Sequence, residues 1–272
     1  MASPTDTWEV MHHWHLVLPP SRPSTYQLDL IRSCCAAIPR QAPVAVLGST
    51  PECRDLLYEC GFVDVSVIDR NAEFFSAMST LRVYSNQERF LEGDWLDVLP
   101  QHPSEFAFVV SDLTSGNVDY DVRPLFYREL SSALLDGGFF FDKVLTHPGP
   151  LLSVASIVEK YAYLPVNLVT INRFSCEMFF CSELLDHAGL VDSSAFYAHL
   201  DRVVQHPRVR RFANEAKLIT PPGCTWWYGR RWPDLSPDYC PSLTRVAIWE
   251  EEATSPYFER LKYFCLRKET IR

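Results

Sequence analysis

The sequence lacks any excess of positive charge. Its 272 residues include 25 Lys and Arg against 34 Asp and Glu, which gives a formal net charge of −9 at pH 7. Binding to DNA or RNA depends on cationic side chains that neutralise phosphates, so this balance argues against nucleic acid as the main partner. No apolar run is long enough to cross a bilayer, and we therefore expect no membrane-embedded segment.

Cysteine motifs that would indicate a metal site or a disulfide framework are also missing. The nine cysteines are odd in number and contain no CxxC pair, which gives a zinc site little support, and we assign no metal ligand. Cys176, Cys181 and Cys265 lie inside apolar stretches and are expected to be reduced and buried. The first residues lack the charged and apolar segments of a signal peptide, so we expect a cytoplasmic protein.

One segment with a single glycine organises the rest of the chain. The apolar run Val44–Leu47 stops at Gly48, a helix follows with Thr50 as its N-cap, and a second apolar run ends at Asp69. Runs that are buried on both faces are typical of parallel strands, so this segment predicts a β-turn-α-β unit. Gly48 lets the backbone approach a ligand, and Asp69 is placed to accept hydrogen bonds from both hydroxyls of a ribose. The alternative is an ordinary tight turn with Asp69 as a surface carboxylate.

Strands and helices continue to alternate as far as residue 145. Further strands are expected at 90–92, 106–110 and 139–145, with helices at about 72–81 and 125–135 between them. The terminal segments 243–249 and 261–266 alternate apolar and polar residues and predict a hairpin.

Polar residues follow two of these strands. After the third strand, Asp94 can accept a hydrogen bond from an exocyclic amine, and Trp95 offers a flat face to an adenine. A loop with a packed tryptophan is the alternative. The cluster 111–117 after the fourth strand suits a ligand crevice, although Asp112 could instead be a turn residue or a helix cap.

Two regions flank this core. Residues 1–42 predict two helices, the second at about 25–37, and form either a lid that brings Arg22 and Tyr26 to a ligand or an arm that covers a sheet edge. Residues 146–241 break the alternation, with helices expected near 150–161, 172–187 and 194–205. The loop from Trp226 to Trp232 mixes aromatics with arginines, so it could cage a cationic or flat ligand, face a partner, or pack as a lid.

The order of elements resembles that of class I S-adenosylmethionine-dependent methyltransferases. VLGSTPE (46–52) resembles the variant first motif VLGxTPE of a bacterial subgroup, and SVIDR (66–70), GDWLD (93–97) and FVVSDLTSGN (108–117) resemble the later motifs. The resemblance implies an α/β, Rossmann-like, doubly wound seven-stranded sheet with an antiparallel last strand. It also implies four regions, a helical lid (1–42), a cofactor-binding core (43–145), a cap for the substrate (146–241) and a terminal hairpin (242–272).

The resemblance implies S-adenosyl-L-methionine as cofactor and assigns its contacts. Three residues would line its methionine part: Gly48, Ser49 and Thr50. Four residues would contact its ribose and adenine: Asp69, Arg70, Asp94 and Trp95. Asp112 would face the sulfonium together with its neighbours Leu113 and Thr114.

The first motif departs from the usual pattern of the family. Val46 stands where an acidic residue is usual, and Thr50 and Glu52 replace the second and third glycines. The cofactor's amino group would then be held by other residues, such as Asp112 or the N-terminal segment.

These features predict a methyltransferase that acts on a small molecule, in specialised metabolism, with a homodimer left open. Substrate contacts are expected from Arg22, Tyr26, Asn117 and Tyr120, and acid–base chemistry from Lys143 or His147, but no catalytic residue is assigned. One alternative keeps the cofactor and cyclises it to azetidine-2-carboxylate with release of methylthioadenosine. The other is a non-catalytic binding or scaffold protein on a degenerate fold.

Overall fold

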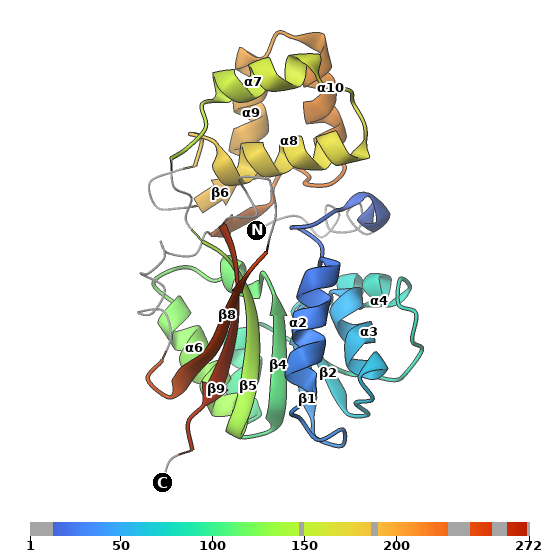
Figure 1. Cartoon of the computed structure of the whole chain (residues 1–272), viewed down its shortest axis with the longest axis vertical. Helices are drawn as coiled ribbons and strands as arrows, with labels where there is room; N and C mark the ends of the chain where they lie inside the picture. Colours follow the sequence, from blue (N-terminus) through green and yellow to red (C-terminus); the bar gives the residue numbers. More distant parts are fainter. Residues whose placement is uncertain (1–12, 147–149, 186–189, 228–239, 252–259, 271–272) are drawn as a thin grey trace.

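The computed structural model describes residues 13–146, 150–185, 190–227, 240–251 and 260–270. Figure 1 shows two parts, an α/β core and a helical cap that stands beyond one end of the sheet. Among the described residues, no helix is both long and apolar enough to span a membrane.

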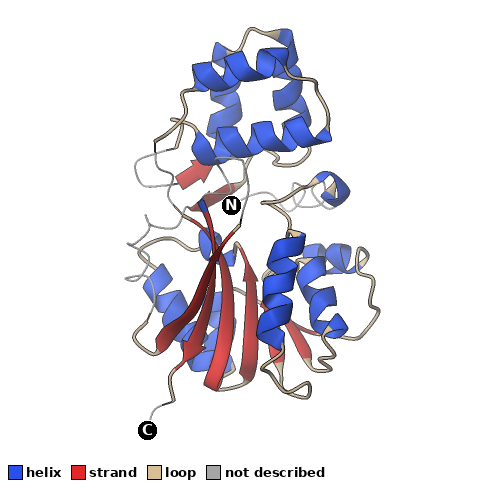
Figure 2. Cartoon of the chain, in the orientation of Figure 1, coloured by secondary structure: helices blue, strands red, loops and turns tan. Residues whose placement is uncertain are grey.

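The core sheet has seven strands in the order β3-β2-β1-β4-β5-β9-β8 (Figure 2). The strands are β1 (Val44–Leu47), β2 (Val65–Asp69), β3 (Arg89–Glu92), β4 (Phe106–Asp112), β5 (Leu134–Leu145), β8 (Leu243–Glu250) and β9 (Leu261–Lys268). The first five are parallel, and β9 runs antiparallel to both β5 and β8. The predicted fold class is therefore confirmed. The strand order reverses between β1 and β4, and ligands of open α/β sheets bind beyond the carboxyl ends of the strands at such a point.

Helices cover both faces of the sheet, which explains the continuous apolar strands. All residues of β1 and β2 are buried, as the apolar runs predicted. The helices α2 (Thr25–Cys35) and α3 (Pro51–Glu59) pack on one face, and α4 (Ala72–Ser79) lies beside α3 (Figure 1). The helices α5 (Trp95–Val98) and α6 (Arg123–Ala133) pack on the other face.

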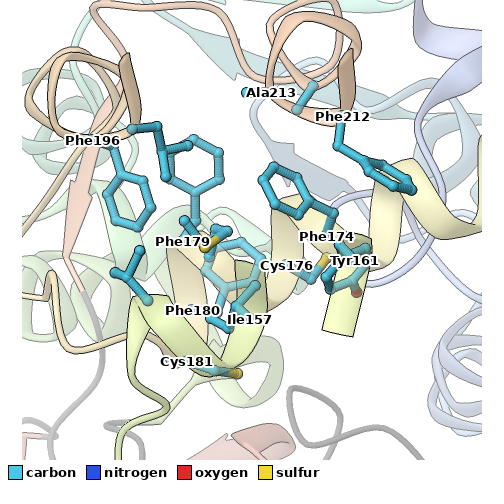
Figure 3. Close-up of a cluster of buried hydrophobic side chains, with 14 of the residues drawn as sticks. Ile157, Tyr161, Phe174, Cys176, Phe179, Phe180, Cys181, Phe196, Phe212 and Ala213 are labelled. Carbon is cyan, nitrogen blue, oxygen red and sulfur yellow. The ribbon is translucent and has the colours of Figure 1, made fainter. Parts of the chain in front are cut away.

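The cap has a hydrophobic core of its own (Figure 3). Its described residues form four helices, α7 (Val154–Tyr163), α8 (Leu168–Cys181), α9 (Ser193–Val203) and α10 (Pro207–Ala216). The rings of Tyr161, Phe174 and Phe212 lie with centroids 5.1 to 5.5 Å apart, so α7, α8 and α10 share one aromatic cluster. The nine cysteines are free thiols, and Cys176, Cys181 and Cys265 are buried as predicted.

Three of the cap helices were expected from the sequence, but α10 was not. Its arginines at 208, 210 and 211 are exposed, whereas Val209, Phe212, Ala213 and Ala216 are buried along one face. The three arginines are therefore the solvated side of an amphipathic helix. The short sheet of β6 (Leu190–Asp192) and β7 (Thr225–Trp227) was also not expected.

The N-terminal segment is tied to both parts of the molecule. Asn172 of α8 accepts a hydrogen bond from Leu18 N at 3.0 Å and donates one to Leu16 O at 2.9 Å. On the core side, Lys143 Nζ donates to Pro20 O at 2.6 Å. The first predicted helix largely falls outside the described residues, and its described end is a single 3-10 turn, η1 (Trp14–Leu16).

Candidate functional site

Gly48 stands at the carboxyl end of β1, where the strand order reverses. Its φ is +91°, a left-handed conformation that favours glycine, and an added Cβ would meet no atom of the described residues within 4 Å. The backbone of the first motif therefore borders open space at Gly48.

Asp69 ends β2 as a buried carboxylate, so the alternative of a surface carboxylate is wrong. Its Oδ2 accepts a hydrogen bond from Ser49 Oγ at 2.6 Å, and its Oδ1 accepts one from Asn71 N at 3.1 Å. Burial raises the pKa of this carboxyl, while the bonds from Ser49 and Asn71 oppose that rise. These two bonds fix the orientation of the carboxylate, and the bond from Ser49 links the ends of β1 and β2.

Trp95 lies beside the same strand end. Its Nε1 donates to Ile68 O at 2.9 Å, and Gly93 N donates to Asp69 O at 3.1 Å. The structure therefore brings Asp69 and Trp95 together, as predicted. Asp94 is exposed and caps α5, because its Oδ1 accepts a hydrogen bond from Leu96 N at 3.0 Å.

Asp112, at the end of β4, belongs to a buried ion-pair cluster that the sequence did not predict. We use this name for Gln27, Thr50, Asp112 and Lys143 together. Lys143 Nζ lies 2.9 Å from Asp112 Oδ1, and the two side chains are 0% and 4% exposed. Gln27 Nε2 donates to the same oxygen at 3.0 Å, and Thr50 Oγ1 lies 3.4 Å from Oδ2. Thr50 is the N-cap residue of α3 as predicted, but its hydroxyl does not cap the helix.

The two residues of the N-terminal region that were predicted to contact a ligand, Arg22 and Tyr26, contact other residues of the protein. Arg22 Nε and Trp14 Nε1 both donate to Glu52 Oε1, at 2.5 and 2.9 Å. Tyr26 is 38% exposed on α2 and meets the ring of Tyr263 edge-on at 6.1 Å. The N-terminal segment thus lies over the start of α3, next to the first motif.

A short 3-10 turn, η3 (Thr114–Asn117), follows β4 and contacts the cap. Leu113, just before it, has a left-handed φ of +62° and packs against the apolar core of the cap. Thr114 Oγ1 donates to Leu47 O at 2.9 Å, which ties the turn to β1. Gly116 lies against the cap, since an added Cβ would stand 3.2 Å from Trp227 O.

The remaining substrate candidates lie at or after this turn. Tyr120 stands 5.4 Å from the ring of Trp227, and the guanidinium of Arg123 lies 4.6 Å from the ring of Tyr120. Asn117 and Arg70 are exposed. His147 lies outside the described residues, as does the Trp226–Trp232 loop beyond its first two tryptophans.

Asp142 supports η3 from the other face of the sheet. It is fully buried in β5 and accepts hydrogen bonds from Tyr127 OH at 2.6 Å and Ser115 Oγ at 3.2 Å. Burial raises its pKa from 3.8 to about 6 despite these bonds. Asp142 was not among the predicted site residues, although an acidic residue inside the run FFFDKVL was a visible signal.

Asp142 should give the protein a measurable pH dependence of stability. Its folded pKa lies above its ordinary value, so the folded state binds more protons between pH 4 and pH 6. The stabilisation is complete below the unfolded pKa and is lost as the pH rises through about 6. We expect the unfolding free energy of the wild type, relative to Asp142→Asn, to fall by about 2–3 kcal/mol over this range and then level off. Urea titrations of both proteins between pH 4.5 and 7.5 measure this, and a constant difference would contradict it.

Comparison with models of protein families and with curated proteins found no match. Solved structures do match. A protein from Rhodobacter sphaeroides described as a Zn-dependent alcohol dehydrogenase has a TM-score of 0.61 at 14% identity, covering 99% of this chain and 100% of that one. A Listeria monocytogenes protein described as an S-adenosylmethionine-dependent methyltransferase has a TM-score of 0.53 at 11% identity, covering 89% and 96%.

A third similar structure is the 1,6-didemethyltoxoflavin-N1-methyltransferase of Burkholderia thailandensis with S-adenosylhomocysteine bound. Its TM-score is 0.52 at 11% identity, and the match covers 99% of this chain and 92% of that one. Within the described ranges, no group of three or more His, Cys, Asp or Glu side chains could hold a metal ion. At these identities the likeness concerns the fold alone, and in fold the chain is similar to S-adenosylmethionine-dependent methyltransferases.

Proposed function

We propose that the protein uses S-adenosyl-L-methionine to methylate a small molecule, in specialised metabolism. The observation that carries this proposal is the arrangement at the strand ends. A buried carboxylate at Asp69, an indole at Trp95 and an open backbone position at Gly48 converge where the strand order reverses. This arrangement fits a nucleoside ligand, and the solved methyltransferases with the same fold support the choice.

Each part of the cofactor has matching chemistry in the chain. Asp69 would accept hydrogen bonds from the ribose hydroxyls, since each carboxylate oxygen can accept a second bond beside its present one. Trp95 would stack on the adenine, with Asp94 and Arg70 at its rim. Gly48, Ser49 and Thr50 would follow the methionine chain, and the sulfonium would face the turn of Asp112, Leu113 and Thr114.

The acceptor would lie between η3 and the N-terminal segment, under the cap. Arg22 and Tyr26 would contact it from the N-terminal segment and α2, and Asn117 and Tyr120 would contact it from η3 and the residues that follow. The bound cofactor supplies an activated methyl group, so this chain's residues need only align the acceptor and exclude water. The cap and the N-terminal segment, which bond to each other through Asn172, are suited to that exclusion.

Gly48 offers a test of the binding site with a matched control. Gly48 and Gly61 have nearly the same φ, +91° and +90°, but a Cβ on Gly61 would only touch Arg40 Cδ at 3.7 Å. Alanine at either position should lower the unfolding free energy by about 1–2 kcal/mol, because both backbones are left-handed. Only Gly48→Ala should weaken S-adenosylhomocysteine binding, on the order of tenfold or more, because its methyl group enters the crevice. Calorimetric titration measures the affinity of both variants for S-adenosylhomocysteine, and equal affinities of the two variants would count against a ligand at Gly48.

A second candidate function keeps the cofactor and changes the reaction to cyclisation. Val46, in place of an acidic residue, leaves the amine of the cofactor without the usual carboxylate, and the aromatic pair of Tyr120 and Trp227 stands near the proposed sulfonium position. Attack of that amine on its own side-chain carbon would form azetidine-2-carboxylate and release methylthioadenosine.

Incubation with S-adenosylmethionine alone separates the candidate functions. Methylthioadenosine formed without an acceptor indicates cyclisation, whereas S-adenosylhomocysteine formed only with an acceptor indicates methyl transfer. If neither product forms and saturating cofactor does not shift the melting temperature, the candidate that remains is a binding or scaffold protein.

A further inference from the structure

Gln27 has a buried side-chain amide whose nitrogen is hydrogen-bonded but whose oxygen is not, among the described residues. The residue is 0% exposed, and its Nε2 donates to Asp112 Oδ1 at 3.0 Å. Its Oε1 is also buried but has no hydrogen-bond partner among the described residues. A buried acceptor without a partner costs about 1–3 kcal/mol, so it calls for a donor that is not part of the protein.

The ion pair of Asp112 and Lys143 can also make further hydrogen bonds. Asp112 Oδ1 accepts from both Lys143 Nζ and Gln27 Nε2, whereas among the described residues Oδ2 has only Thr50 Oγ1 at 3.4 Å. That distance is well beyond the usual 2.7–2.8 Å of a hydroxyl hydrogen bond. Lys143 has three N–H donors, and the structure directs two of them to Asp112 and Pro20 O. A buried ion pair is weak evidence of a stabilising role, so a binding role deserves the first test.

The cluster stands where the proposed cofactor would place its amino-acid end. Thr50 is two residues beyond Gly48, and Asp112 and Lys143 are neighbours in the register of β4 and β5. Glu52 belongs to the same neighbourhood, because the charges of Asp112, Glu52 and Lys143 all act on the thiol of Cys53, whose pKa is raised mainly by burial. Val46 provides no acidic group at this end of β1.

We propose that the ion-pair cluster binds the zwitterionic α-amino-acid group of the ligand, an assignment that rests on the proposed function. The ammonium of the ligand donates to Gln27 Oε1 and Asp112 Oδ2, and its carboxylate accepts from Lys143. The cluster and the zwitterion are each neutral, so the charges alternate and no net charge is buried. Pro20 O holds Lys143 from the N-terminal side, which makes the N-terminal segment the outer wall of this subsite.

Three ligands test the assignment on the full-length wild-type chain by calorimetric titration. They are S-adenosylhomocysteine, its analogue without the α-amino group, and 5′-methylthioadenosine, which keeps the nucleoside but has no amino-acid group. We expect both analogues to bind on the order of 10- to 100-fold more weakly than S-adenosylhomocysteine. Equal affinity for all three would overturn the subsite and leave the proposed function standing. Failure of all three to bind would overturn the proposed function and this assignment with it.

A variant pair tests the role of the amide. Gln27→Leu should weaken S-adenosylhomocysteine binding on the order of 10- to 100-fold and change 5′-methylthioadenosine binding by less than about threefold. The control is Gln101→Leu, which removes an exposed amide that donates to Asp97 O on the other face of the sheet, and it should change neither affinity. An equal loss for both ligands in Gln27→Leu would show a merely structural role and overturn the assignment. If that variant does not fold, the three-ligand comparison on the wild type still decides.

Discussion

Replacing Asp69 with alanine is expected to weaken S-adenosylhomocysteine binding by about 100-fold or more. The proposed contact is two charge-assisted hydrogen bonds to the ribose, each worth about 1.5–3 kcal/mol. Asp69 is already buried and is oriented by Ser49 and Asn71. The free-energy cost of desolvating and orienting this carboxylate is therefore met when the protein folds and not when the ligand binds. Calorimetric titration gives the affinity, and thermal unfolding shows whether the variant is folded.

The matched control is Asp64→Ala. Asp64 is an exposed aspartate just before the other end of β2, and its removal should leave the affinity unchanged. An Asp69→Ala variant that binds as tightly as the wild type would remove the central contact of the proposed function. A comparable loss in both variants would point to a general charge effect and not to a ribose contact.

The sequence predicts the core well because parallel strands covered on both faces leave a strong local signal. Val44–Leu47 is a continuous apolar run and 65–69 is a mostly apolar one, and both became fully buried strands inside the sheet. Since the carboxyl ends of neighbouring parallel strands meet, the positions of Gly48, Asp69 and Trp95 in the chain were enough to predict that they converge.

The cap was harder to predict because its elements depend on partners that are distant in the chain. The strands β6 and β7 pair across a gap of more than 30 residues, and each is only three residues long. No local periodicity marks so short a strand. The helix α10 has its buried residues at helical spacing, at Val209, Phe212, Ala213 and Ala216, so this helix left a local signal that was not used.

The ion-pair cluster could not be predicted because it depends on strand register. Asp112 lies opposite Lys143, and Ser111 lies opposite Asp142. Successive residues of a strand face opposite sides, so Lys143 joins Gln27 on the α2 face while Asp142 joins Tyr127 on the α6 face. Although they are adjacent in the sequence, Lys143 and Asp142 therefore contact different groups. Lys143 pairs with Asp112 beside the proposed cofactor, and Asp142 bonds to Ser115 of η3.

The largest expected effect on stability is that of Arg54→Met. Arg54 is 0% exposed, bonds through Nε to both carboxylate oxygens of Glu88 at 3.0 and 3.1 Å, and donates from Nη2 to Ser79 Oγ at 2.7 Å. It also donates to Ser49 O at 3.3 Å, so it supports the turn that carries Gly48. Removing one partner of a buried pair should lower the unfolding free energy by about 3–5 kcal/mol, measured by urea denaturation.

Arg32→Met is the control for the loss of an arginine as such. Arg32 is 43% exposed and pairs with Asp29 and Glu59 at the surface, so its replacement should cost less than about 1 kcal/mol. Glu88 has a second buried partner, because Arg82 Nη1 lies 2.8 Å from its Oε2. Replacing both members, Arg54→Met with Glu88→Leu, should therefore recover little of the loss, because Arg82 then loses this partner. Similar losses for Arg54→Met and Arg32→Met would show that solvent reaches the pair of Arg54 and Glu88. The turn at Ser49 would then be held by the helix α3 itself and not by this buried arginine.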